Sequence, residues 1–240
     1  MIELNAVSKS YGAGTKKAVD NLSLVVRPGE IFGFLGPNGA GKTTTIKMMV
    51  GLLRPNSGSV SINGYDIATQ PLDAKRQIAF VPDTPEVYDR LSGLEYLNFV
   101  GDIYGVVPAE RRARIERLGE TFELTGALGD RISGYSHGMQ QKLVLMGALL
   151  HNPPVWILDE PMVGLDPRSA HQLKELMAEH TRQGRTLFFS THVLEVAEKL
   201  CDRVAIINNG RIIAHGTMAE LRRGQAGESL EEIFLELTES

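Results

Sequence analysis

The octapeptide GPNGAGKT, from Gly36 to Thr43, decides the fold because it fits the pattern G-x-x-x-x-G-K-[ST]. The β-forming run Ile31–Leu35 leads into it, and a helical pattern over Thr43–Val50 follows it. Glycines leave the backbone N–H groups of such a loop open to phosphate oxygens, and the following helix directs the positive end of its dipole at them. The segment therefore predicts a triphosphate-binding loop between a buried strand and a helix.

Two side chains complete the predicted phosphate site. Lys42 supplies a positive charge for the outer phosphates, and the hydroxyl of Thr43 is suited to bind Mg²⁺. The chain lacks an N-K-x-D sequence for guanine recognition. Kinases, GTPases, motors and transporters share this kind of loop, so the rest of the chain has to decide between them.

A second acidic element follows the apolar run Val155–Leu158, which ends in Asp159 and Glu160. A buried strand of this kind delivers its last residues to the carboxyl edge of a parallel sheet, where ligands bind. Adjacent strand residues point in opposite directions, so a turn at the strand end is needed to bring both carboxylates into the site. We expect Asp159 to hold Mg²⁺ through water and Glu160 to polarise the attacking water.

Two further polar segments are suggestive but weak by themselves. In Tyr135–Gln141, YSHGMQQ, Ser136 is a good N-cap and Gly138 keeps the backbone open, so this helix start could bind a second anion. His192 follows the buried strand Thr186–Ser190, where it could donate to a phosphate oxygen. Alone, each is more often structural than functional.

The alternation of β-forming runs with helical patterns predicts an α/β fold with a mostly parallel sheet. Residues 204–207 and 211–214 flank Asn208–Asn209–Gly210 and are typical of a hairpin. We predict one domain, residues 1–240, with an α/β core and antiparallel β subdomain in 1–82 and 152–220, a helical insert in 83–151 and a C-terminal helix in 228–240. The predicted helices of the insert are Ser92–Tyr104, Ala109–Leu124 and Ser136–Leu150, and a capping box at Ser229–Glu232 opens the last helix.

The bulk composition excludes several classes of protein. Of 240 residues, 42% are hydrophobic and 22% charged, as in an ordinary globular protein, and the single cysteine, Cys201, rules out an internal disulfide. The apolar run Leu143–Leu150 is far shorter than the roughly 20 residues of a membrane span. The net charge of -4 does not favour nucleic-acid binding. We interpret the basic run Arg111–Arg117, interleaved with glutamates, as a solvated helix face.

Taken in order, GPNGAGKT, YSHGMQQ, VWILDEP, GLDP and STH resemble the ATPase subunit of ABC transporters over nearly the whole chain. The tail SLEEIFLELTES resembles the exporter branch of that family, in which a separate permease spans the membrane. The resemblance implies an ABC ATPase fold and an ATPase at the cytoplasmic face of the membrane. It also implies ATP and Mg²⁺ as cofactors, the permease and a second ATPase subunit, of the same or a related chain, as partners, and no nucleic acid.

The resemblance also implies residue roles. Tyr11 would stack on adenine, and Asp166 would link the two nucleotide sites across the interface between subunits. Ser136 and Gly138 would cap the γ-phosphate held by the second subunit, while His192 would contact the γ-phosphate and hold the catalytic base Glu160 in register. The triphosphate would be held by Gly36, Pro37, Asn38, Gly39, Ala40, Gly41, Lys42, Thr43 and Thr44, and Mg²⁺ by Thr43, Asp159 and Asp83.

Two positions depart from the family pattern. The signature LSGGQ is YSHGM here, with His137 for the first glycine and Met139 for glutamine. Asp83 stands after the predicted strand Ile78–Val81, where the family usually has a glutamine that touches Mg²⁺. Aspartate can accept a hydrogen bond from metal-bound water but cannot donate one.

The ABC resemblance leaves three alternatives to a transporter subunit. Relatives in DNA repair or chromosome structure usually carry a long coiled coil, and no sustained heptads occur between the motifs here. Ribosome-associated relatives typically join two such domains in one chain, and this chain holds one. A catalytically silent regulatory subunit would not be expected to keep Lys42, Asp159, Glu160 and His192.

Overall fold

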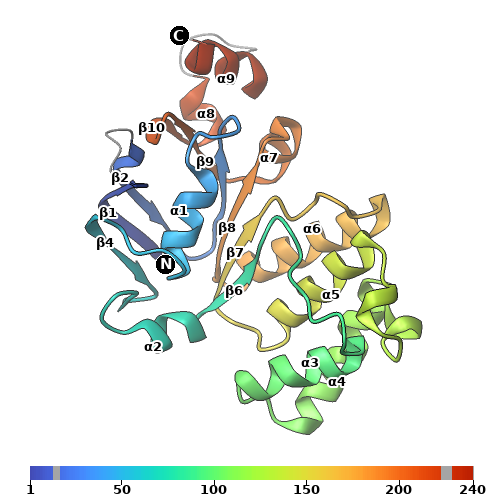
Figure 1. Cartoon of the computed structure of the whole chain (residues 1–240). Helices are drawn as coiled ribbons and strands as arrows, with labels where there is room; N and C mark the ends of the chain where they lie inside the picture. The colour runs from blue at the N-terminus through green and yellow to red at the C-terminus, as the bar shows by residue number, and fades with distance from the viewer. Residues whose placement is uncertain (13–16, 223–228, 240) are drawn as a thin grey trace. The chain divides into compact units, whose positions relative to one another are not determined.

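A computed structural model describes residues 1–12, 17–222 and 229–239, which form two compact units (Figure 1). The first unit comprises residues 1–78, 154–160 and 177–240, and the second comprises residues 79–153 and 161–176. The strands are β1 Ile2–Ser10, β2 Lys17–Val26, β3 Ile31–Leu35, β4 Ser57–Ile62, β5 Tyr65–Asp66, β6 Ile78–Val81, β7 Val155–Asp159, β8 Thr186–Thr191, β9 Arg203–Asn208 and β10 Arg211–Gly216.

The helices are short to medium in length. They are α1 Lys42–Met49, α2 Pro71–Arg76, α3 Gly93–Ile103, α4 Pro108–Thr121, α5 His137–Leu149, α6 Pro167–Arg182, α7 Leu194–Leu200, α8 Met218–Leu221 and α9 Leu230–Glu239, with 3₁₀ turns at Thr125–Ala127 and Ile132–Gly134. Among the residues described, no helix is both long and apolar enough to cross a membrane.

A six-stranded sheet in the order β10-β9-β3-β8-β7-β6 carries the predicted buried runs. Strands β9, β3, β8 and β7 are parallel, whereas β10 pairs antiparallel with β9. Every residue of β3, β7 and β8 is buried, which explains why apolar residues follow one another in these strands, as in Leu187–Phe189, rather than alternating with polar ones. Their register places Phe34, Ser190 and Asp159 side by side. The carboxyl ends of three strands therefore meet at one edge.

A four-stranded antiparallel sheet in the order β2-β1-β4-β5 forms the predicted β subdomain. The turn between β4 and β5 is Asn63–Gly64, with φ of 51° and 86°. Positive φ at both positions matches the right-handed strand twist, which explains the Asn-Gly pair.

The β9–β10 hairpin is confirmed, and its turn reaches the phosphate loop. Asn209 and Gly210 have φ of 47° and 78°. The N–H of Gly210 donates to the carbonyl of Ala40 at 2.9 Å, while the N–H of Asp20 donates to the carbonyl of Gly210 at 2.8 Å. The hairpin turn is thus hydrogen-bonded to the backbone of the phosphate loop at Ala40.

The second unit contains the predicted helices, with ends within three residues of the predicted ones. Ser92 begins α3 with a capping box, in which its hydroxyl accepts from the N–H of Glu95. One interpretation was wrong: Arg111 does not lie on a solvated face. Its side chain is buried and donates to Asp102 and to the carbonyl of Val106, because α4 packs against the end of α3 there.

The C-terminal helix α9 is confirmed and packs through one face. Ser229 and Glu232 form the predicted capping interaction, and Leu230 and Ile233 are buried. Helix α9 contacts α7, which directly follows His192 in the chain. Residues 228 and 240 of the predicted helix lie outside the described residues.

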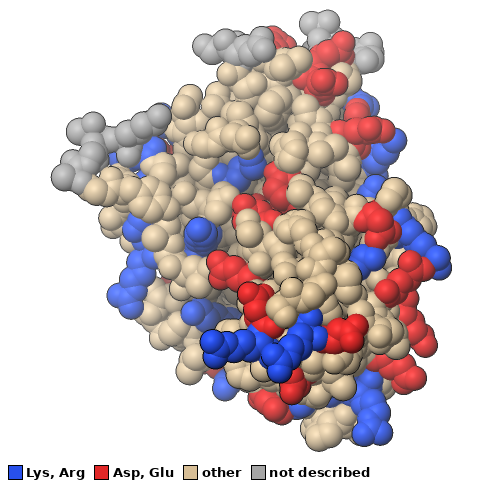
Figure 2. Space-filling model, turned by 45° about the vertical axis from the view of Figure 1, so that its right-hand side comes forward, with Lys and Arg blue, Asp and Glu red and all other residues tan. Residues whose placement is uncertain are grey.

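On the face shown in Figure 2, acidic and basic side chains both occur.

Candidate nucleotide site

The phosphate loop joins β3 to α1 in the first unit, and its glycines are required by close packing. Gly41 has φ of 111°, and a Cβ added there would lie 2.5 Å from the carbonyl oxygen of Ala18. A Cβ added at Gly36 would overlap the carbonyl oxygen of Ile207. Asn38 and Gly39 are exposed at the tip of the loop, with Pro37 half-buried and Ala40 buried. The loop is thus packed on one side and open on the other.

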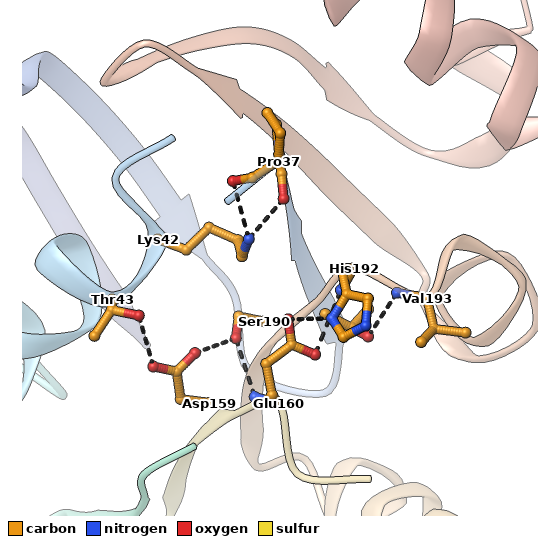
Figure 3. Close-up of polar contacts among 10 residues, drawn as sticks. Pro37, Lys42, Thr43, Asp159, Glu160, Ser190, His192 and Val193 are labelled. Atoms are coloured by element: carbon orange, nitrogen blue, oxygen red, sulfur yellow. Dashed lines mark hydrogen bonds and ion pairs between the residues drawn. The ribbon is translucent and has the colours of Figure 1, made fainter. Parts of the chain in front are cut away.

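Lys42 lies inside the loop (Figure 3). Its Nζ donates to the carbonyls of Gly36 at 2.6 Å and Pro37 at 3.3 Å, and the residue is 8% exposed. Burial lowers the pKa of Lys42, and the negative charges of Glu160 and Asp159 oppose this effect. The loop carbonyls and the two carboxylates therefore stabilise the charged amine in the cavity of the loop.

Asp159 ends β7 and faces the first turn of α1. Its Oδ2 accepts from the hydroxyl of Thr43 at 3.2 Å, and its Oδ1 accepts from the hydroxyl of Ser190. Asp159 is only 2% exposed, whereas Thr43 is exposed. A carboxylate and a hydroxyl this close are a set of hard oxygen donors, which is the chemistry that Mg²⁺ prefers.

Glu160 is turned into the same site by its backbone. Its φ is 48°, in the left-handed region. This conformation interrupts the strand alternation, so that the carboxylates of Asp159 and Glu160 can both face the site. Its N–H donates to the carbonyl and the hydroxyl of Ser190 at 3.2 and 3.1 Å. Its carboxylate meets His192, whose Nδ1 lies 2.9 Å from Oε1 and whose N–H lies 3.4 Å from Oε2 (Figure 3).

Tyr11 lies against Thr44, which belongs to the first turn of α1. The phenol oxygen of Tyr11 is 3.3 Å from the hydroxyl of Thr44, and Tyr11 is 55% exposed. An exposed ring next to the phosphate loop offers an aromatic face to a planar ligand.

The remaining predicted residues lie in the second unit. Asp83 is exposed after β6 and accepts from the N–H of Thr84 at 2.9 Å. Ser136 is the N-cap of α5 and accepts from the N–H of Met139 at 3.3 Å. A Cβ added at Gly138 would lie 2.9 Å from the carbonyl oxygen of Gly164, so the helix start packs closely on the segment before Asp166.

Asp166 has a structural task within its own chain. Its carboxylate accepts from the N–H and the hydroxyl of Ser169, at 2.9 and 2.8 Å, at the start of α6. The amine of Lys142 on α5 lies 2.7 Å from Oδ2, the oxygen that also accepts from the hydroxyl of Ser169. The hydrogen bond from Lys142, followed by those from Ser169, holds the pKa of Asp166 well below its usual range. Asp166 therefore joins the middle of α5 to the start of α6 within one unit.

Comparisons with known proteins agree with this geometry. A family model described as ABC transporter matches residues 19–163. The doxorubicin resistance ATP-binding protein DrrA of Mycobacterium tuberculosis is 40% identical over 232 residues, which cover 97% of this chain and 70% of that protein. The chain belongs to the ABC transporter family. As an ATP-binding subunit of that family, it binds and hydrolyses ATP.

Solved structures of ABC ATP-binding subunits have the same fold. One, an ATP-binding subunit of an ABC transporter, matches with a TM-score of 0.94 at 40% identity, covering 99% of each chain. Another is a dimeric ATP-binding cassette in a post-hydrolysis state, bound to ADP and Pi. It matches with a TM-score of 0.83 at 25% identity, covering 91% of this chain and 99% of that one.

Two partners in this ABC site escaped the sequence analysis. Ser190 appeared only as the end of a β-forming run, and its bonds to Asp159 and Glu160 depend on strand register, which sequence patterns do not give. Lys142 lies in a mostly apolar helix, and its polarity was a usable signal that it has a partner.

Proposed function

We propose that this chain powers an ABC exporter: with a second ATPase subunit it closes on ATP and drives a separate membrane permease, at the cytoplasmic face of the membrane. One observation carries the proposal. In the first unit, Thr43 is hydrogen-bonded to Asp159, and His192 to Glu160, whereas the second unit presents an additional N-capped helix start without a phosphate loop of its own among the residues described. The likeness to a doxorubicin resistance protein supports export.

In this proposal the phosphate loop binds the triphosphate. Lys42 exchanges the carbonyls of Gly36 and Pro37 for phosphate oxygens, since a charge-assisted hydrogen bond to an anion is stronger than one to a neutral carbonyl. Tyr11 stacks on the adenine. The backbone N–H groups of Asn38, Gly39 and Gly41 and the hydroxyl of Thr44 supply the remaining donors.

Thr43, Asp159 and Asp83 would hold Mg²⁺. When bound, the cation neutralises charge on the outer phosphates. The chain's own residues do the rest. Asp159 keeps its Oδ2 beside Thr43 because its Oδ1 is occupied by the hydroxyl of Ser190.

Glu160 activates the water. His192 Nδ1 lies 2.9 Å from Oε1 and fixes the carboxylate, whereas the bond from the His192 N–H to Oε2 is long, at 3.4 Å. Oε2 is therefore the oxygen better placed to accept a hydrogen bond from water and polarise it. His192, 58% exposed at its side chain, also reaches the γ-phosphate.

Pairing follows from differential affinity, because a ligand shifts an equilibrium only through the state that it binds more tightly. Ser136 and Gly138 bind the γ-phosphate of the second subunit's nucleotide, so these donors contribute only in the closed pair. Asp166 connects the two sites at the interface. Loss of the γ-phosphate on hydrolysis removes the bridge and lets the pair open.

A direct test is the molar mass of the Glu160→Gln variant by light scattering with MgATP and with ADP. The proposal expects a particle of twice 26.3 kDa with MgATP and of 26.3 kDa with ADP, if the chain pairs with itself. If the natural second subunit is a related chain, the variant pairs only in its presence. A variant that binds ATP but never pairs, alone or with such a chain, contradicts the proposal.

A further inference from the structure

Ser190 touches both acidic residues of the site, although it binds neither nucleotide nor metal in the scheme above. It lies next to the end of β8, is 0% exposed, and stands opposite Asp159 in the register of β7 and β8. Its hydroxyl donates to Oδ1 of Asp159 and accepts from the N–H of Glu160 at 3.1 Å (Figure 3). A single buried hydroxyl thus touches both acidic residues.

The bond to Asp159 selects one orientation of its carboxylate. The terminal torsion of aspartate is broad, so packing alone fixes it weakly. With Oδ1 held by Ser190, the carboxylate leaves Oδ2 at 3.2 Å from the hydroxyl of Thr43. The oxygen that faces α1 is therefore chosen by Ser190.

The bond to Glu160 stabilises an uncommon backbone conformation. A non-glycine residue with φ of 48° is disfavoured unless its surroundings hold it there. Both acceptors of the Glu160 N–H, the carbonyl at 3.2 Å and the hydroxyl at 3.1 Å, belong to Ser190. Ser190 therefore holds the N–H of Glu160, where the turn that directs the Glu160 side chain towards His192 begins.

We propose that Ser190 is a positioning residue that couples the two carboxylates, orienting Asp159 towards the metal and holding Glu160 towards the water with one hydroxyl. This inference rests on the MgATP site proposed above. Removal of a hydrogen-bond partner of a metal ligand typically lowers metal affinity or activity about 10- to 100-fold. Ser190→Ala should therefore weaken metal binding, while nucleotide binding without metal stays unchanged.

The test measures Mn²⁺ binding by electron paramagnetic resonance, with a non-hydrolysable ATP analogue and the full chain. Ser190→Ala is compared with Thr186→Ala, which deletes a buried hydroxyl about 13 Å away on the same strand, where it accepts from the N-terminal amine. The expected result is Mn²⁺ affinity roughly tenfold lower or more for Ser190→Ala. Thr186→Ala should match the wild type, and Ser190→Thr, which keeps a hydroxyl, should recover much of the loss.

Equal Mn²⁺ affinity in Ser190→Ala and Thr186→Ala overturns the inference. If Ser190→Ala does not fold, Ser190→Cys replaces it, because a thiol is a much weaker donor. Wild-type affinity in Ser190→Cys then overturns the inference, and a weakened one supports it. If the wild type itself binds no Mn²⁺ with the nucleotide analogue, the proposed MgATP site fails instead.

Discussion

The phosphate-loop site of the first unit and the Ser136 helix start of the second unit differ in how completely their polar groups are hydrogen-bonded and buried. In the first, Asp159, Ser190, Glu160 and His192 are joined by hydrogen bonds, and the first two are buried. In the second, Ser136 is exposed, and its hydroxyl accepts from the N–H of Met139 in an ordinary N-cap. One region is organised for chemistry, and the other offers donors to something outside it.

We propose that this difference separates two functions of one chain, hydrolysis and pairing. Groups that are already oriented cost no reorganisation when charge develops, so the first region can set the rate of hydrolysis. An exposed helix start gains an anion only when another molecule presents one. Changes in the first region should therefore alter nucleotide binding or hydrolysis, and changes in the second should alter pairing.

The largest effect is expected for Glu160→Gln. Removing general-base assistance should lower the hydrolysis rate about 10²- to 10⁴-fold, while ATP stays bound. Phosphate release under steady-state conditions measures this. Glu179→Gln makes the same charge change on an exposed part of α6 and should keep the wild-type rate. An unchanged rate in Glu160→Gln refutes the assignment of the base.

Lys42→Ala should weaken nucleotide binding. The lost interactions are hydrogen bonds to charged groups, at about 1.5–3 kcal/mol, which corresponds to roughly 10- to 150-fold in affinity. Titration with a fluorescent ATP analogue checks this. Lys47→Ala, on the exposed face of α1, is the matched control and should bind like the wild type. Equal loss in both variants would mean that total charge, not the loop, determines affinity.

Ser136→Ala tests the helix start of the second unit. Loss of an N-cap costs about 1 kcal/mol of stability, and Ser92→Ala, which removes the cap of α3, should cost a similar amount. Only Ser136→Ala should also reduce ATP-driven pairing, with nucleotide affinity of the single chain unchanged. Thermal unfolding and light scattering measure the two effects. Equal pairing in both variants would remove the anion-binding role of Ser136.

The smallest effect concerns Asp166. Its folded pKa is depressed, so its ionised form adds stability above pH about 4, which is lost as the pH falls through the folded pKa. Asp166→Asn keeps a capping side chain but not the charge. Because the side chain is 45% exposed, the expected change is only about 1 °C in Tm at pH 7, and it should shrink as the pH falls below about 4. A difference that grows in acid contradicts this sign.

Much of the fold could be predicted because the signals are local. Ile31–Leu35 and Ile78–Val81 were placed with the bounds that the structure has, since short apolar runs between turns leave few alternatives. The hairpin at Asn209–Gly210 followed from turn chemistry. Arg111 was misplaced because burial of a charged side chain depends on a partner, Asp102, from another helix.

The site was partly predictable for the same reason. The phosphate loop and the Asp159–Glu160 pair are contiguous in the sequence, so their chemistry can be recognised there. The bonds that organise them are not contiguous: Ser190 and His192 reach Glu160 from a neighbouring strand through register and a positive φ. The roles of the site residues in both units stay predictions, because they concern contacts with nucleotide, metal and a second subunit.

The central claim is that this chain serves a membrane permease as one of two ATPase subunits. The measurement that tests it most directly is affinity purification of Glu160→Gln from native membranes in mild detergent with MgATP, beside the double variant that adds Ser136→Ala. The account predicts that Glu160→Gln recovers a polytopic membrane protein with a second ATPase subunit, and that the double variant loses the ATP-driven pair. Recovery with ribosomes or DNA, or without any membrane protein, would contradict it.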